Sequence, residues 1–291
     1  MKLGLVFPTR RIGPDPGTIA AYAHAAEEAG YRFLATYDHV IGADRDARPG
    51  WQGFYDIDDE FHEPFVLFGF LAAVCSLELS TCVLVLPQRQ TVLVAKQAAE
   101  VDVLSGGRLR LGVGVGWNDV EYDALGVPFG HRGERLEQQI ALLRALWTER
   151  RVDGVVGGSC GERVVAAGLA PLPVQRPIPV WLGGSTERAW HRVGRLADGY
   201  LPPPGIHPGR GLDAAMTVIR TAADAAGRDP DSIGLEGILP VRDGDVAGLR
   251  ARLARWEDAG ADGVALSVDS PDLLGASNID AIRRLADDLL G

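Results

Sequence analysis

Lysine and cysteine are scarce in this 291-residue chain, and each scarcity narrows the possible chemistry. Lys2 and Lys96 are the only lysines. Neither follows a predicted strand, which argues against an enzyme that forms a Schiff base at a strand end. The three cysteines, Cys75, Cys82 and Cys160, lack metal-ligand spacing. An odd count without a disulfide framework favours a reducing, cytoplasmic setting.

Long apolar runs and excess positive charge are also missing. No run approaches the roughly 18 residues that a membrane span needs. The apolar N-terminal segment, residues 1–7, is too short for a signal peptide. A net charge of −10 argues against nucleic acid and anionic membranes as partners. It leaves a small anionic ligand possible, because local arginines and helix N-termini act at short range. Without a carboxylate cluster in the sequence, we expect no catalytic metal.

Short apolar segments alternate with helical patterns along the whole chain. Strands are predicted at 2–7, 33–36, 77–86, 109–113, 179–182, 199–201, 233–240 and 263–268. Helices are predicted at 17–29, 91–104, 132–147, 186–196, 212–226, 246–259 and 279–290, and an apolar helix after Pro64. Eight strand–helix alternations predict one α/β domain over 1–291, a (β/α)8 TIM barrel. The alternative is a doubly wound open sheet, which usually has fewer repeats.

Two segments look like insertions into this repeat. Residues 42–62 follow the second strand and contain Trp51, Phe54 and Tyr55. Residues 152–175, rich in glycine, valine and proline, precede the fifth strand. Loops of this length are often lids or specificity elements. We predict that the first is a substrate lid; the second fits surface elaboration equally well.

Candidate catalytic residues stand where the second strand ends. Asp38 and His39 follow it directly, at the end of a barrel strand that faces bound ligands. A histidine there can donate to a ring or carry a proton near neutral pH. The alternative is a capping aspartate beside a hydrogen-bonded loop histidine.

Glycines follow the fourth and fifth strands. Gly112, Gly114 and Gly116 do not have the spacing of the dinucleotide-binding fingerprint. They fit either close backbone contact with a ligand or tight packing at the strand end. Gly183-Gly184-Ser185 leads into a helix, where backbone N–H groups suit a phosphate, although serine and threonine are also ordinary helix caps.

Arginines are the remaining candidates for ligand contact. Arg10, Arg11, Arg89 and Arg132 lie near predicted strand-to-helix loops. Each could hold an anionic group by paired hydrogen bonds, or form an ordinary ion pair.

Taken together, these motifs resemble the luciferase-like monooxygenase superfamily, and more narrowly its branch that uses coenzyme F420. The similar segments are Asp38-His39, Pro64 with its apolar helix, 104–108, 112–117 and 179–184. The resemblance implies a barrel with its cofactor at the carboxyl-terminal mouth, and a homodimer.

The resemblance also implies roles for particular residues. A cis peptide between Cys82 and Val83 would bulge beneath the deazaflavin ring, with Asp38 and His39 beside it. Val115, Gly116 and the 183–185 turn (Gly183, Gly184 and Ser185) would contact the phosphate arm.

One position departs from the pattern. In the sugar-phosphate dehydrogenases of this branch a glutamate follows the glycine turn, whereas this chain has Trp117, which we expect to line the pocket. Glu121, one turn further on, could replace that acid, but we expect it to hold the helix start.

The resemblance therefore implies an F420-dependent oxidoreductase that moves a hydride between the deazaflavin and a small organic substrate. One alternative is an FMN-dependent monooxygenase of the same superfamily. Another is a non-catalytic barrel that binds flavin or F420.

Overall fold

Eight parallel strands close into a barrel in the computed structural model, which describes residues 1–156, 161–241, 245–268 and 273–290. The barrel strands are β1 (Lys2–Val6), β2 (Phe33–Thr36), β3 (Glu78–Thr81), β5 (Leu109–Gly114), β8 (Val180–Gly183), β9 (Gly199–Leu201), β10 (Gly234–Pro240) and β11 (Gly263–Ser267). Their order is β3-β2-β1-β11-β10-β9-β8-β5, and pairing of β3 with β5 closes the ring. The predicted TIM barrel is confirmed, and the open sheet is excluded.

The third barrel strand differs from the prediction of one continuous strand over 77–86. It breaks after Thr81 and resumes as β4 (Leu84–Val85), which pairs with the end of β5 and leads into the short helix η1 (Leu86–Gln88). The break coincides with the Cys82–Val83 peptide bond, which is cis. The predicted cis peptide is therefore confirmed.

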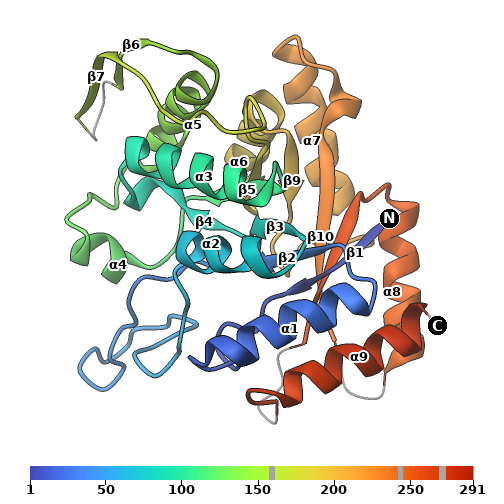
Figure 1. Ribbon diagram of the computed structural model, residues 1–291. Helices are drawn as coiled ribbons and strands as arrows, with labels where there is room; N and C mark the ends of the chain where they lie inside the picture. Colours follow the sequence, from blue (N-terminus) through green and yellow to red (C-terminus); the bar gives the residue numbers. More distant parts are fainter. Residues whose placement is uncertain (157–160, 242–244, 269–272, 291) are drawn as a thin grey trace.

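Helices cover the outside of the barrel (Figure 1). The larger ones are α1 (Pro16–Glu28), α2 (Pro64–Val74), α3 (Thr91–Ser105), α5 (Arg132–Thr148), α6 (Glu187–Leu196), α7 (Leu212–Ala225), α8 (Val246–Asp258) and α9 (Ser277–Leu290). Two short helices, α4 (Asp119–Ala124) and η2 (Pro230–Ser232), were not expected from periodicity. The seven helices predicted with both ends agree within two residues at each end.

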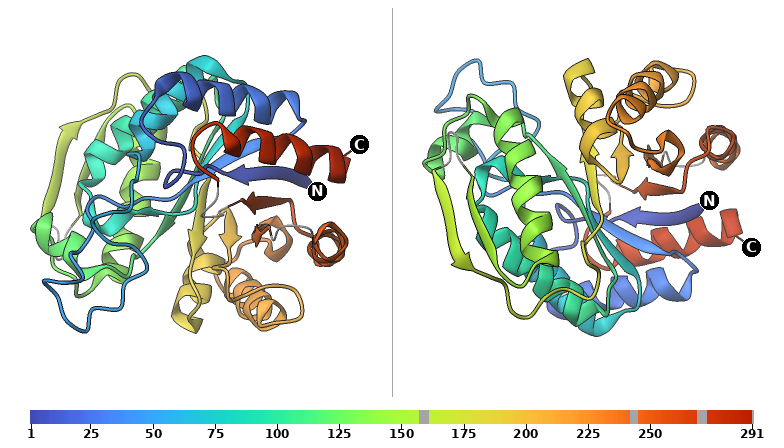
Figure 2. Two further views of the ribbon diagram at one scale, coloured as in Figure 1. Left: turned by 90° about the horizontal axis from the view of Figure 1, so that it is seen from below. Right: turned by 90° about the horizontal axis from the view of Figure 1, so that it is seen from above.

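The two insertions differ in structure. Residues 42–62 form an irregular loop in which Ala43 and Asp56 make an isolated bridge. The second insertion contains an antiparallel hairpin of β6 (Val152–Val156) and β7 (Glu162–Ala167). Cys160 lies outside the described residues. Figures 1 and 2 show that both insertions project from the half of the barrel that carries α3 to α5, away from α8 and α9.

The barrel interior is filled by large side chains that face small ones. Arg110 forms an ion pair with buried Glu236 and stacks over Trp181, 4.5 Å from the ring centroid. Burial raises the pKa of Glu236, and the neighbouring Arg110 opposes that shift. The Cys82 side chain belongs to the same buried cluster as Phe33, and the Arg110 guanidinium lies 5.3 Å from the centre of the Phe33 ring. Packed side chains therefore fill the barrel below its mouth.

Candidate functional site

The bulge at Cys82–Val83 lies at the carboxyl end of the third strand, between two neighbouring strands. A Cβ atom on Gly114 of β5 would lie 2.5 Å from Val83 Cγ2, and one on Gly183 of β8 would lie 3.1 Å from Val83 Cγ1. Both glycines therefore make room for the Val83 side chain. Burial raises the pKa of the Cys82 thiol, so this cysteine is not a ready nucleophile, and its contribution at the mouth is its peptide group.

Asp38 is buried and holds the chain that follows the bulge. Its carboxylate accepts hydrogen bonds from Val85 N at 2.9 Å and from Arg89 Nη2 at 2.6 Å. Arg89 Nη1 donates in turn to Glu63 at 2.9 Å. Burial by itself would lower the pKa of Arg89, but the two carboxylates raise it. The pair fixes the segment from Val85 to Arg89 at the rim of the barrel.

His39 forms a pair with Glu121, a residue of α4. His39 Nδ1 lies 2.8 Å from Glu121 Oε1, and the backbone N–H of Val40 donates to the same oxygen at 3.2 Å. Only 1% of the Glu121 side chain is exposed. A carboxylate at Nδ1 favours the tautomer with its proton on Nδ1, which leaves Nε2 to accept or exchange a proton.

Glu121 differs from the expectation that it holds the helix start. The Asn118 side chain caps α4 by accepting a hydrogen bond from Val120 N at 3.2 Å, whereas Glu121 reaches across to His39. The signal for this helix was present in the sequence, because an asparagine followed by acidic residues is a typical helix N-terminus. That Glu121 pairs with His39 could not be predicted from the sequence.

An aromatic cluster covers His39. We use this name for Trp51, Phe54, Tyr55 and Phe61 of the first insertion together with Trp117. Ring centroids of Tyr55, Phe61 and Trp117 lie 4.6, 4.7 and 5.8 Å from the His39 ring. The sequence-predicted lid residues thus contact the predicted catalytic histidine or its neighbour Trp117.

The insertion is attached to the barrel through the loop after β1. Arg10 forms an ion pair with Asp59, with a hydrogen bond of 2.6 Å from Nε, and its guanidinium lies 5.0 Å from the centre of the Tyr55 ring. The backbone N–H of His62 donates to Thr9 Oγ1 at 2.9 Å. These contacts hold the aromatic cluster over the mouth.

The turn after β5 has accessible backbone. Gly116 has a φ of +66°, and a Cβ there would also lie 2.5 Å from Val85 Cγ1. Val115 and Gly116 are half-buried, and Trp117 is 37% exposed. The Val115 carbonyl accepts a hydrogen bond from Tyr122 Oη at 2.8 Å, which ties the turn to α4.

The turn after β8 leads into α6. Thr186, and not Ser185, caps this helix by accepting from Ala189 N at 3.3 Å. Ser185 is exposed and precedes the cap, while the Gly184 carbonyl accepts a hydrogen bond from Tyr200 Oη at 2.8 Å. Burial raises the pKa of Tyr200 to about 12, so it stays a hydrogen-bond donor at neutral pH.

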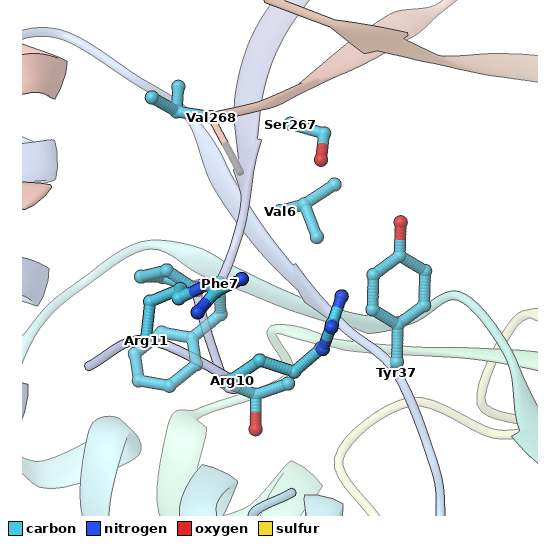
Figure 3. Close-up of a pocket in the computed structure, with 9 residues that line it drawn as sticks. Val6, Phe7, Arg10, Arg11, Tyr37, Ser267 and Val268 are labelled. Atoms are coloured by element: carbon cyan, nitrogen blue, oxygen red, sulfur yellow. The ribbon is translucent and has the colours of Figure 1, made fainter. Parts of the chain in front are cut away.

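A small hollow opens at the carboxyl ends of β1, β2 and β11. Figure 3 shows Arg10, Arg11 and Tyr37 around it, together with Ser267. Arg10 lines this hollow and also pairs with Asp59, so it joins the hollow to the insertion. The remaining predicted arginine, Arg132, donates to the carbonyls of Gly116 and Phe129.

Contacts around the mouth connect the bulge, Gly183, the 115–117 turn and His39. The bulge touches Gly183 directly, and the 115–117 turn links it to His39 through Trp117. In the described part of the chain, no group of three or more His, Cys, Asp or Glu could hold a metal. No helix of the described ranges is long and apolar enough to cross a membrane.

A closed parallel barrel with histidine, glycine turns and arginine at the carboxyl ends of its strands is the architecture of the α/β-barrel enzymes. The luciferase-like monooxygenase family matches residues 1–267 of the chain. This chain belongs to that family. An uncharacterized protein of Mycobacterium tuberculosis is 33% identical over 271 residues, which are 89% of each chain.

Solved structures with the same fold include an F420-dependent enzyme and a monooxygenase. An F420-dependent secondary alcohol dehydrogenase, in complex with an F420–acetone adduct, has a TM-score of 0.77 and 16% identity, covering 99% of this chain and 98% of its own. The monooxygenase RslO1 of Streptomyces bottropensis has a TM-score of 0.73 and 22% identity, covering 100% and 99%. At these identities the likeness establishes the fold.

Proposed function

We propose that this protein is an F420-dependent oxidoreductase that moves a hydride between the deazaflavin and a small organic substrate. The observation that carries the proposal is the grouping of the half-buried bulge, two accessible glycine turns and a carboxylate-oriented histidine around one barrel mouth. A likeness to an F420-dependent alcohol dehydrogenase supports it at the level of the fold.

The residues at the mouth fit a flat ring with a phosphate arm. The Val83 side chain lies between Gly114 and Gly183 and is only half-buried. It offers a small apolar surface on which a flat ring could pack. The backbone N–H of Gly116 and the hydroxyl of the exposed Ser185 are the groups that we assign to the phosphate oxygens. A bound deazaflavin supplies hydride chemistry at its central ring carbon.

His39 is the group that we assign to proton movement. With Glu121 at Nδ1, its Nε2 can give a proton to, or take one from, a substrate oxygen. Tyr55 and Phe61 of the aromatic cluster pack against the His39 ring and exclude water from those sides of it.

Asp38 we assign to positioning, because its carboxylate is engaged by Arg89 and Val85. By holding Val85 it fixes the two-residue strand β4 that follows the bulge. Trp51, Phe54 and Tyr55 we assign to a lid that orders the substrate against the cofactor.

The alternative is an FMN-dependent monooxygenase. The same mouth also suits a flavin, and the fold is shared with the monooxygenase RslO1. FMN chemistry of this kind would require oxygen and a reductase partner. The non-catalytic barrel is the third possibility, and the His39–Glu121 pair argues against it.

The test compares turnover with cofactor affinity. For His39→Ala we expect hydride transfer to fall about a hundredfold or more, while the F420 dissociation constant changes little. His191→Ala is the matched control, since this histidine is half exposed on α6, and it should leave both values unchanged. Equal turnover in the wild type and His39→Ala would refute the role assigned to His39.

We further propose that the protein works in the cytoplasm as a homodimer. Apolar side chains on the outer faces of α2 and α3, among them Val66, Phe70 and Leu93, are exposed and could be covered by a second copy. Light scattering after size-exclusion chromatography measures the mass directly.

A further inference from the structure

We propose that the aromatic cluster selects a neutral, planar, apolar substrate, such as an aryl ketone or the matching alcohol, over a phosphorylated or carboxylated one. The inference rests on the proposed function for its place in a reaction. The binding preference itself follows from the rings and charges around His39.

The rings of the cluster leave apolar surface open to solvent. Phe54 is 75% exposed and Trp117 is 37% exposed. Their ring centroids lie 5.4 Å apart with planes at 85°, and Trp51 lies 6.0 Å from Trp117 at 38°. Flat apolar molecules stack well on the faces of such rings. Their binding removes the exposed apolar area of the rings from water.

Phe54 is the ring of the aromatic cluster that a ligand can displace most easily. Among the described residues its ring has one aromatic partner, Trp117, and most of its surface faces solvent. Tyr55, in contrast, is held by His39, Phe61 and the guanidinium of Arg10. A planar ligand can therefore replace Phe54 against Trp117 without disturbing the rings that hold His39.

Three arginines around the cluster are already paired with carboxylates, and Arg132 donates to the carbonyls of Gly116 and Phe129. Arg10 pairs with Asp59, and Arg45 pairs with Asp56 at 2.6 Å. Arg89 has two carboxylate partners, Asp38 and Glu63. The two carboxylates together outweigh its single positive charge. A ligand phosphate would have to displace one of these carboxylates from its arginine, which leaves that carboxylate unpaired.

The local charge at His39 acts in the same direction. The acid paired with His39 is buried Glu121, 2.8 Å from Nδ1. An anionic group placed beside His39 therefore meets the Glu121 carboxylate, whereas a neutral one gains from apolar contact.

The experiment uses three naphthalene probes of one ring size with the purified full chain: acetylnaphthalene, acetylnaphthoate and naphthyl phosphate. Affinities are measured by calorimetry with and without F420. We expect acetylnaphthalene to bind at least about tenfold more tightly than either anion. Trp117→Ala should weaken its binding about fivefold or more, whereas Phe54→Ala, which removes the ring that the ligand displaces, should leave it no weaker.

Val165→Ala, which removes an exposed apolar side chain from β7, is the control and should change nothing. Phe54→Lys should move the preference toward the anions, and because Phe54 is 75% exposed, misfolding is a poor explanation for any loss. Equal or tighter binding of the anions, or full affinity in Trp117→Ala, would overturn the proposal. Neutral-probe binding without any F420 binding would support the cluster's selectivity and refute the proposed cofactor instead.

Discussion

Removing the Asp38 carboxylate tests whether this residue positions the mouth or takes part in the chemistry. The Asp38 side chain is fully buried and faces Arg89, of which 14% is exposed. Asp38→Ala leaves the Val85 N–H without its acceptor and breaks the buried ion pair. Breaking such a pair costs about 3–5 kcal/mol of unfolding free energy. Because Glu63 still pairs with Arg89, we expect the lower end, about 3 kcal/mol.

Asp38→Asn should cost less, about 1–2 kcal/mol, because the amide oxygen can still accept from Val85. The assay is urea unfolding followed by circular dichroism, with F420 affinity measured on the same samples. Glu28→Gln is the matched control, since its ion pair with Arg283 is exposed and should contribute under about 0.5 kcal/mol. If Asp38→Asn unfolds at the wild-type urea midpoint while turnover collapses, Asp38 acts in the reaction and the positioning role is wrong.

Three further predictions test other parts of the account. Glu121→Ala should lower turnover about tenfold to a hundredfold in a steady-state assay without weakening cofactor binding, because the acceptor that orients His39 is removed; unchanged turnover would contradict the pairing. Gly112→Ala should destabilise the fold by about 3 kcal/mol in denaturant unfolding, since its Cβ would lie 1.9 Å from the Thr81 carbonyl oxygen; wild-type stability would contradict the tight approach. Burial alone would raise the pKa of Glu137, but its arginine partners on α6 lower it. Its stabilising effect should be present above a pH of about 4.3 and fade as the pH falls through the lowered pKa, so the stability gap between wild type and Glu137→Gln should shrink in acid; a gap that widens there has the opposite sign to this argument.

Much of the barrel could be predicted because its elements follow local rules. Each strand is a short apolar run between turn residues, and Gly30, Gly227 and Gly260 follow the ends of their helices. The break after Thr81 is different, because no periodicity marks it and only the resemblance indicated the cis peptide. The β6–β7 hairpin was missed because its valines and glycines fit a loop equally well.

The candidate site was predictable in its members but not in their partners. Asp38 and His39 are adjacent in sequence, yet one pairs with Arg89 and the other with Glu121, 82 positions away. Such contacts depend on how loops from different strands meet at the mouth. Phe61 lies inside the predicted lid segment but was not among the residues expected to cover the substrate, and it also joins the aromatic cluster.

The most direct test of the central claim is a fluorescence titration of the purified protein with F420 and, separately, with FMN. The account predicts saturable F420 binding that is at least about tenfold tighter than FMN binding. Tight FMN binding with weak F420 binding would contradict it in favour of the oxygen-using flavin enzyme. Binding of neither would mean that Gly114, Gly116 and Gly183 serve the packing of the bulge alone.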